Sequence, residues 1–332
     1  MPPARWQLRP AHKPTRWKAA EMPRSLQRHT RGASLVELMV GMIIALMVLA
    51  IGLQLLLIAR ARYQRLADEA LIEDRGMRAL ELIGKAVRQA GWITDTPTAS
   101  AVRRWADATA PLSLVGADDC GQPKKTVELE CGPHGVQHSD ALLVRFSGRN
   151  HLPPNAHEAD GATLDCDNYG VRERAGTEAD PRLGSMLLFI SVSTDAEQAP
   201  RLMCRSVSLN SGDVLVAVNA SEIVRGVETL QLLYTLAPTT TSPAETVSAR
   251  TIAATDWYRV EQVHVAIVVR GDWYSLRPST PDNIALFPGL ESVPGARLED
   301  LSFQPEDPRR NRALFTATFA VRNPLRCEVD AC

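Results

Sequence analysis

The first third of the chain is dominated by one long apolar segment. Leu38 to Ala59 form a run of 22 residues in which Gln54 is the single polar side chain. At a rise of 1.5 Å per residue, a helix of this length crosses the roughly 30 Å hydrocarbon core of a bilayer. The segment 33–59 therefore predicts one membrane-spanning helix.

The helical pattern continues after the apolar segment. Apolar residues recur at intervals of three, three and four positions, which predicts one buried helix face: Met77, Leu80, Ile83 and Val87. No proline occurs between Pro23 and Pro97, and Gly91 supplies a stop signal. We expect one helix from about Ala33 to Ala90, whose amphipathic continuation covers residues 60–93.

Beyond Pro97 the hydrophobic period changes from that of a helix to that of a strand. Seven β-branched or alternating runs, separated by Gly, Pro, Asn and Asp clusters, predict strands. They are Leu142–Phe146, Ser185–Ser193, Leu202–Ser208, Val214–Asn219, Val227–Leu236, Val260–Arg270 and Ala313–Arg322. In the sixth run, four β-branched residues alternate with His264 and Ala266, which predicts a half-buried strand.

These elements predict an α+β fold. We expect residues 94–332 to form a β-rich head whose antiparallel sheet packs on the second half of the helix. Long connections separate the predicted strands: 94–126, 148–184, 237–242 and 277–310. Loops of such length are usually functional or disordered, so contacts with partners are expected there.

The distribution of charge along the chain predicts the orientation of the helix in the membrane. Residues 1–32 hold eight Lys or Arg and one acid, Glu21, whereas the remaining chain holds 29 basic and 37 acidic residues. A basic flank before an apolar segment predicts a cytoplasmic N-terminus and a head outside the cytoplasm. An acidic remainder argues against nucleic acid as a partner, because phosphate binding needs clustered Lys and Arg.

A secretory signal peptide is the alternative interpretation of the apolar segment. Ala59-Arg60-Ala61 has the small-x-small form of a signal peptidase site. However, the apolar core of a signal peptide runs only about 7 to 15 residues. Arg60 and Arg62 also crowd that site. These features favour a retained membrane anchor.

Glu37 is a charged residue at the start of the apolar segment. One interpretation is a solvated carboxylate at the membrane interface, where the helix dipole favours it near the N-terminus. The other is a functional, paired carboxylate, because an unpaired charge within a membrane helix costs about 2.5 to 3.5 kcal/mol.

The string Gly32-Ala33-Ser34-Leu35-Val36-Glu37, with its basic flank and apolar sequel, resembles the leader motif of type IV pilins and pseudopilins. The resemblance implies that prepilin peptidase cuts between Gly32 and Ala33, removes residues 1–32 and methylates Ala33. It implies that Glu37 pairs with the Ala33 amine of a neighbouring subunit during assembly. Ala33 departs from the phenylalanine usual in the family, and Gln54 from a common proline.

Three further stretches resemble the PilW group of large minor pilins: Ala79–Ile93, Ile223–Leu236 and Leu314–Pro324. This resemblance implies a minor pilin that primes type IV pilus assembly, at the pilus tip. Its implied partners are prepilin peptidase, other minor pilins, the major pilin and a tip adhesin. The implied location is the inner membrane, with a periplasmic head, and then the pilus at the cell surface, where pili serve motility and adhesion. A minor pseudopilin of a type II secretion system, which shares leader, helix and sheet, is the alternative.

Six cysteines follow the apolar segment, and outside the cytoplasm they should form disulfides. Fifteen connectivities are possible. Proximity in sequence favours Cys120 with Cys131, Cys166 with Cys204 and Cys327 with Cys332.

Two clusters raise the question of a metal site. Cys131, His134 and His138 lie close in sequence but lack the second ligand pair of a zinc site. Asp165, Asp167 and Asn168 lack the spaced carboxylates and glycine of a calcium loop, which favours a role in turns. We therefore predict no metal.

Catalytic motifs are missing from the sequence. It contains no GxSxG, no HExxH and no phosphate-binding loop, so we expect neither an enzyme nor a cofactor. A membrane-tethered hydrolase and a ligand-binding adhesin are the alternative classes. A purified head that lacks hydrolytic activity and copurifies with small pilins would separate them from a pilus subunit.

Overall fold

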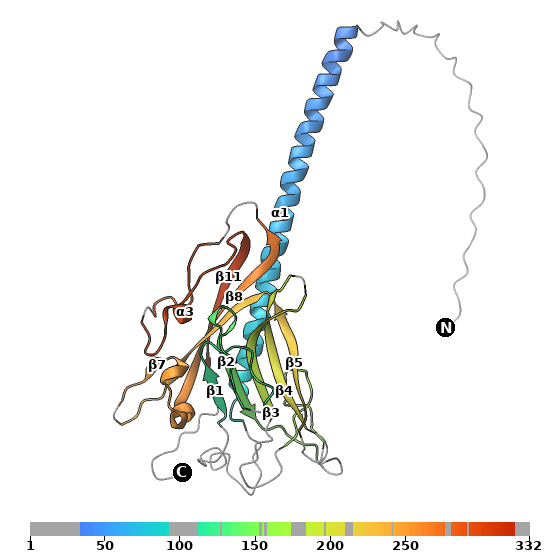
Figure 1. The fold of residues 1–332 in the computed structure, drawn as a ribbon. Coiled ribbons are helices and arrows are strands. Elements are labelled where there is room, and N and C mark those ends of the chain that lie inside the picture. The colour runs from blue at the N-terminus through green and yellow to red at the C-terminus, as the bar shows by residue number, and fades with distance from the viewer. Residues whose placement is uncertain are drawn as a thin grey trace, which may run out of the picture. The chain divides into compact units, whose positions relative to one another are not determined.

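The structure of the chain is a computed structural model (Figure 1). The structure describes residues 34–92, 112–126, 128–152, 155, 158–173, 184–195, 197–209, 215–240, 242–275, 280–290 and 292–322, with backbone alone at 207–209 and 215–219. Two compact units divide the chain, Met1–Ile58 and Ala59–Cys332, and each is described by itself.

One helix, α1, runs through Leu35–Gln89, close to the bounds predicted from sequence. It belongs to the first unit up to Ile58 and to the second from Ala59 onward. Its final residues pass into a turn at Gly91, whose backbone φ of 72° suits glycine. The predicted stop signal therefore lies where the helix ends.

The second unit contains a five-stranded sheet that is an antiparallel meander in the order β1-β2-β3-β4-β5. Its strands are β1 (Leu114–Ala117), β2 (Ala141–Phe146), β3 (Gly184–Val192), β4 (Pro200–Leu209) and β5 (Leu215–Arg225). β2 to β5 match predicted runs. β1 was missed because four residues, LVGA, carry too little alternation to stand out.

A four-stranded antiparallel sheet follows, in the order β11-β8-β6-β7 (Figure 1). It contains β6 (Val227–Leu236), β7 (Glu245–Val247), β8 (Val260–Tyr274) and β11 (Arg310–Ala320). A single residue, Gly226, links β5 to β6 and carries the chain from one sheet to the other at a φ of 88°. The head thus contains two main sheets, where the sequence analysis predicted one.

Short elements connect these strands. β9 (Ile284–Ala285) and β10 (Ser302–Phe303) form a two-stranded ribbon, and α3 (Leu298–Leu301) is one helical turn. Three 3-10 helices lie at Val136–His138, Ala249–Thr251 and Ala254–Arg259. The ribbon and α3 occupy part of the predicted loop 277–310, where the tract is too short and Pro-rich for its period to be read.

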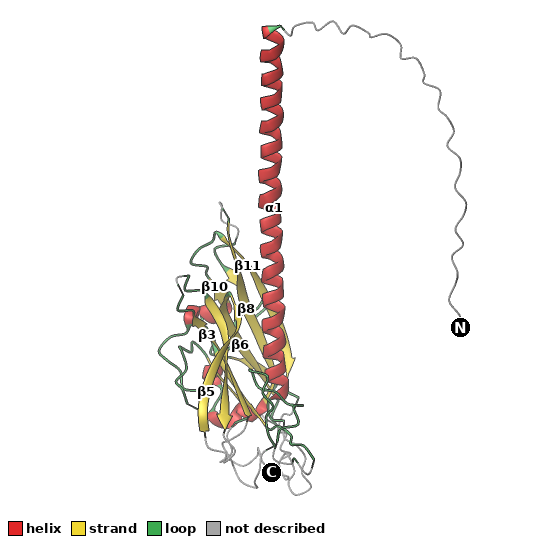
Figure 2. Cartoon of the chain, turned by 90° about the vertical axis from the view of Figure 1, so that its right-hand side faces the viewer, coloured by secondary structure: helices red, strands yellow, loops and turns green. Residues whose placement is uncertain are grey.

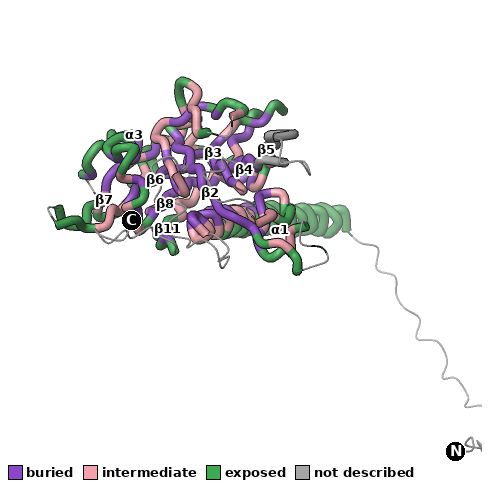
Figure 3. The backbone as a smooth tube through the Cα atoms, turned by 90° about the horizontal axis from the view of Figure 1, so that it is seen from below, coloured by how far each residue is buried: buried purple, intermediate pink, exposed green. Residues whose placement is uncertain are grey.

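The main core lies between the second part of α1 and both sheets (Figures 2 and 3). β8 contributes Val263, Val265, Ile267 and Val269 to this core, as the alternation predicted. The prediction of a half-buried strand was wrong, because Ala266 and Val268 on the other face are also fully buried. They pack with Leu286, Val293 and Phe303 in a second cluster, so the 284–303 segment covers that face.

Candidate functional site

The candidate site begins at the start of α1. Ser34 precedes the helix, and its Oγ accepts a 3.4 Å hydrogen bond from the backbone N–H of Glu37 in the first turn. This is the geometry of a serine N-cap. The Glu37 side chain is exposed, at the helix end where the dipole favours a carboxylate. Gly32 and Ala33, the predicted cleavage and methylation residues, lie outside the described residues.

The first part of α1 presents an exposed apolar surface. Every residue from Leu35 to Ile58 is exposed, and leucine, isoleucine, valine and methionine side chains retain about half or more of their surface. Among the described helices, α1 alone is long and apolar enough to cross a membrane by length and composition. This surface is consistent with membrane anchoring.

The second part of α1 packs on the head through small residues. A Cβ atom added to Gly76 would lie 2.4 Å from the Phe315 ring, and one added to Gly84 would lie 2.5 Å from Phe319. Both rings come from β11, and Ala79 and Ala86 of the helix are also fully buried. Small residues on α1 therefore let the helix approach the edge of the four-stranded sheet closely.

The predicted buried face of this part was wrong in one position. Ile83 and Val87 are fully buried, and Leu80 is half-buried against the core. Met77, however, leaves 57% of its surface exposed. The buried face instead contains Ile72, Gly76, Ala79 and Ile83. Gly76 faces the Phe315 ring, so the side of the helix that packs on the head begins with a small residue there and not with Met77.

Two charged residues join α1 to the end of β8. Asp68 Oδ1 accepts hydrogen bonds from the backbone N–H groups of Asp272 at 2.8 Å and Trp273 at 3.1 Å. Asn311 Nδ2 donates to Asp68 Oδ2 at 3.2 Å. Arg75 forms a forked ion pair with Asp272, at 2.9 and 2.8 Å. The hydrogen bond from Arg75 holds the pKa of Asp272 below its usual range, despite partial burial.

Sequence analysis missed these joining residues. Asp68, Arg75, Gly76 and Gly84 each depart from the apolar period that was used to find the helix face. An isolated glycine costs about 1 kcal/mol in a helix interior, so Gly76 and Gly84 were a usable signal of close packing. Nothing comparable in the local sequence marks Asp68, whose hydrogen-bond partners lie some 200 positions later.

A groove runs beside this packing interface. It has a volume of about 690 Å³ and is lined by Asp74, Met77, Arg78, Leu80, Glu81 and Arg88 of α1 and by Ala317 and Phe319 of β11. The Arg88 guanidinium lies over the Phe319 ring, 5.6 Å from its centre. β11 is an edge strand, paired with β8 on one side. The groove therefore joins an edge of the sheet to an exposed helix face.

The structure contains two disulfides among the described residues. Cys120 pairs with Cys131, with Cα atoms 5.0 Å apart, and Cys166 pairs with Cys204, with Cα atoms 5.9 Å apart. Both are pairs that sequence proximity favours. The third predicted pair, Cys327 with Cys332, lies outside the described residues, so it stays a prediction.

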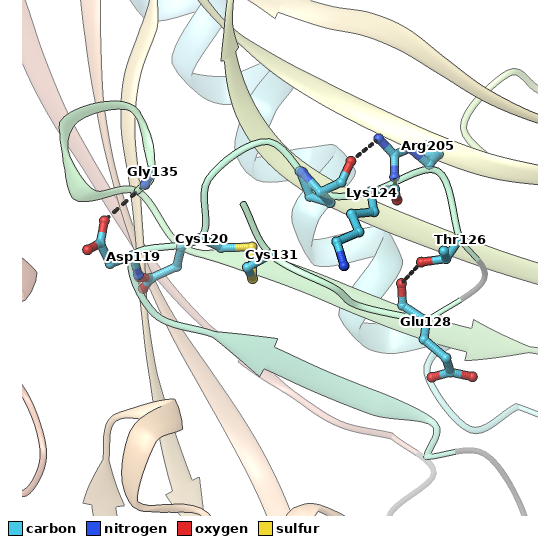
Figure 4. Close-up of a disulfide and its surroundings, with 10 residues drawn as sticks. Asp119, Cys120, Lys124, Thr126, Glu128, Cys131, Gly135 and Arg205 are labelled. Atoms are coloured by element: carbon cyan, nitrogen blue, oxygen red, sulfur yellow. Dashed lines mark hydrogen bonds between the residues drawn. A yellow bond between two sulfur atoms is a disulfide. The ribbon is translucent and has the colours of Figure 1, made fainter. Parts of the chain in front are cut away.

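The first disulfide closes a loop that is fastened to the sheet (Figure 4). Arg205 of β4 donates to the carbonyl oxygens of Pro123, at 2.8 Å, and Lys124. Its guanidinium also lies 5.2 Å from the centre of the Phe189 ring. The loop is thus held against β3 and β4 by one buried arginine.

The two candidate metal clusters serve other contacts. Cys131 is in a disulfide, while His134 and His138 both face the Asp119 carboxylate, at 3.0 and 3.4 Å. Asp165 Oδ1 accepts from the backbone N–H groups of Asp167 and Tyr169, a turn-forming arrangement. Within the described part of the chain, no group of three His, Cys, Asp or Glu could hold a metal ion.

The described residues thus define an α+β protein with one long, partly apolar N-terminal helix whose second part packs on antiparallel sheets, which confirms the predicted fold class. Residues 189–323, from β3 to just after β11, match the model of the PilW family, Type IV Pilus-assembly protein W. The match covers less than half of the chain; it includes the stretch Ile223–Leu236 and all but the last residue of Leu314–Pro324, both given above for this resemblance. The resemblance to PilW-like type IV pilins is therefore confirmed for that segment.

Other comparisons add little. No curated protein matches the chain. Among solved structures, it is similar to a Type IV-like pilin, TTHA1219 from Thermus thermophilus, with 13% sequence identity and a TM-score of 0.38. That alignment covers 76% of this chain and 98% of the other. A likeness at this TM-score carries no functional argument.

Proposed function

We propose that this chain is a minor pilin that primes and takes part in the assembly of type IV pili, at the pilus tip with other minor pilins. The observation that carries the proposal is the pairing of an exposed apolar helix, which starts at an N-capped turn holding Glu37, with a head whose 189–323 segment resembles the PilW family. The apolar surface of residues 35–58 suits lipid first and neighbouring helices afterwards.

Cleavage of the leader at the predicted site would create a charge partner for Glu37. Cleavage between Gly32 and Ala33 would place a new cationic amine four residues before Glu37 in the sequence. In an apolar filament core, a charged amine needs an opposite charge nearby, because burial of an unpaired charge is costly. Glu37 of an adjacent subunit supplies that charge and would set the axial register.

Glu37→Ala tests this proposal. The variant should insert in the membrane and be processed normally, with Ala33 as its methylated N-terminus by mass spectrometry. It should nevertheless reduce the number of surface pili and the copurification of other minor pilins. Glu158→Ala, which removes an exposed carboxylate from the head, is the matched control and should leave both unchanged. Normal piliation and normal copurification in Glu37→Ala would show that the carboxylate has only an interfacial role.

The bulk of the head supports a place at the tip. A head with long connecting loops would crowd its neighbours if it recurred at each step of a filament, whereas the tip has no subunit above it. Quantitative mass spectrometry of sheared pili should therefore find few copies per pilus, and deletion should reduce pili more than membrane-bound major subunit. Near-equal amounts of this chain and the major subunit, or lost protein secretion with intact pili, would contradict the proposal. The second result would favour a type II secretion pseudopilin.

A further inference from the structure

Three buried carboxylates lie where the five-stranded sheet meets the four-stranded sheet. Asp118 directly follows β1, Asp140 directly precedes β2, and Asp300 belongs to α3. The side chains of Asp118 and Asp300 are 2% and 4% exposed, and Asp140 is 1% exposed. β1 and β2 are antiparallel, with Ala117 opposite Ala141, so the next pair in this register is Asp118 with Asp140. Like charges directly opposite each other on paired strands are destabilising.

Asp140 fastens the start of β2 to β6 of the other sheet. Its backbone N–H donates to the carbonyl oxygen of Leu230 at 2.8 Å. Its Oδ2 accepts from the backbone N–H of Leu232 at 2.7 Å, and its Oδ1 accepts from that of Asp119 at 3.1 Å. Both carboxyl oxygens are therefore held by neutral backbone donors, at a point where the two sheets are joined.

One arginine serves the other two carboxylates. Arg250 Nη1 lies 2.5 Å from Asp300 Oδ2 and 3.6 Å from Asp118 Oδ2. The backbone N–H groups of Ala249 and Arg250 also donate to Asp118, at 3.2 and 2.9 Å. Among the described residues, none forms an ion pair with Asp140. Three ionised acids around one cation would leave two buried negative charges without compensation, which is costly.

Two nearby histidines face a different carboxylate. His134 Nδ1 and His138 Nδ1 lie 3.0 and 3.4 Å from the oxygens of Asp119. Both imidazoles leave about half or more of their surface exposed. Any positive charge that they carry is therefore directed to Asp119, and Asp140 keeps no cationic partner.

The Tyr234 hydroxyl also lines the cluster without adding a positive charge. It is completely buried and has no hydrogen-bond partner among the described residues. It lies against β1, because a Cβ atom added to Gly116, two residues before Asp118, would overlap it. Burial first, and then the charges of Asp140 and Asp118, raise the pKa of Tyr234 well above its ordinary value, so the hydroxyl stays neutral.

The electrostatics of the cluster favour a bound proton. Burial, and then the charge of Asp118, raise the pKa of Asp140 well above its ordinary value of 3.8. The folded state therefore binds this proton more tightly than the unfolded chain does. The resulting stabilisation is complete below pH 3.8, decreases as the pH rises above it, and is gone once the pH exceeds the raised pKa of Asp140.

We propose that Asp140 carries a proton in the folded head and that this proton is part of a lock between the two sheets, which is tight in mildly acidic surroundings and weakens as the pH rises. The neutral carboxyl keeps its two backbone hydrogen bonds and places no charge opposite Asp118. Ionisation keeps those hydrogen bonds but adds a buried negative charge that no cation faces. The proposal rests on the positions and partners of these residues and not on the proposed pilus function.

Denaturant unfolding of the full chain in detergent, from pH 5 to pH 9, tests the lock. Asp140→Asn is neutral at every pH, so it removes the titration. The ratio of unfolding equilibrium constants, wild type over variant, should rise about tenfold per pH unit from pH 5 until Asp140 ionises in the folded chain, because one proton is linked to unfolding. Asp282→Asn, which changes an exposed carboxylate, is the control and should give a ratio that stays constant within about twofold.

Infrared spectroscopy of the wild-type chain keeps the test independent of whether Asp140→Asn folds. At pH 6 ordinary carboxyl groups are ionised, so the carbonyl band of a protonated carboxyl should come from the folded cluster. That band should disappear on unfolding at the same pH. In Asp118→Asn it should disappear at a lower pH than in the wild type, because the charge that opposes ionisation of Asp140 is gone.

Three results would overturn the proposal. They are a ratio of unfolding constants that does not change between pH 5 and 9, the absence of the protonated carboxyl band from the folded wild type at pH 6, and stabilisation by added Ca²⁺ at pH 8 that Asp140→Asn abolishes. The third would show that a bound cation, and not a proton, neutralises the cluster. None of these measurements needs a pilus, so their outcome is separate from that of Glu37→Ala.

Discussion

Gly76 of α1 lies so close to Phe315 of β11 that an added Cβ atom would sit 2.4 Å from the aromatic ring. Gly76→Ala should therefore destabilise the chain by up to about 2 kcal/mol, since overpacking costs about 1–3 kcal/mol and alanine recovers about 1 kcal/mol in helix propensity. Thermal unfolding of the full chain in detergent measures this loss. Gly76→Ala combined with Phe315→Leu should restore part of it.

Gly52 provides the matched control for that substitution. An added Cβ there meets nothing within 4 Å, so Gly52→Ala should leave stability unchanged or slightly raised. Equal effects of the two substitutions would show that the contact between Gly76 and the ring is not tight.

Removal of the Asp68 carboxylate should loosen the junction between α1 and β8. Asp68→Ala leaves the backbone N–H groups of Asp272 and Trp273 without their acceptor, which should cost about 2–4 kcal/mol. Asp68→Asn keeps one acceptor oxygen and should cost less. Asp74→Ala removes an exposed carboxylate from the same helix and should change the unfolding free energy by no more than about 0.5 kcal/mol. Equal losses for Asp68→Ala and Asp74→Ala would refute this role.

The two described disulfides should differ in their contribution to stability. The bond between Cys166 and Cys204 closes a loop with a sequence separation of 38, against 11 for Cys120 and Cys131. In the chain-entropy account their contributions are about 4 and about 3 kcal/mol. Paired Cys→Ser variants should show this order in denaturant unfolding. Nonreducing peptide mapping should also find the predicted third bond, and free thiols in the exported chain would contradict it.

The turn between β3 and β4 should respond to acid. A hydrogen bond from the Ser193 hydroxyl and an ion pair with Arg225 lower the pKa of Asp195 to about 2. The folded chain therefore favours the carboxylate, so the stabilisation is present above the ordinary pKa of 3.8 and is lost as pH falls toward 2. Asp195→Asn should lower the melting temperature slightly at pH 6, and this difference should vanish between about pH 4 and 2. A difference that persists at pH 2 would show that Asp195 acts only through packing.

Whether an element of the fold could be predicted from the sequence depended on how long and how regular its apolar pattern is. α1 and the seven predicted strands were readable because their apolar periods extend over many residues. β1 was too short to read, and the second sheet depended on Gly226, whose turn reassigns β6 to new neighbours. The burial of both faces of β8 could not be predicted, since it depends on a segment that begins ten residues after that strand ends.

Sequence analysis likewise found some residues of the candidate site and missed others. Gly32, Ala33 and Glu37 form a contiguous motif, so sequence analysis could propose them together. Asp68 acquires its role through partners distant in sequence, and no local pattern carries that information. The ion pair proposed for Glu37 requires a neighbouring subunit, so one chain cannot display it.

The junction at Asp68 and Arg75 has a mechanical consequence. In the second unit α1 runs alongside β8 and β11 (Figure 2). The first buried residue of the helix is Asp68, which is hydrogen-bonded to the end of β8. Tension applied to this part of the helix would enter the sheet at the end of β8 and act along the strands. Ladder hydrogen bonds run perpendicular to antiparallel strands. Such a pull would load many of them together in shear instead of peeling them apart one by one.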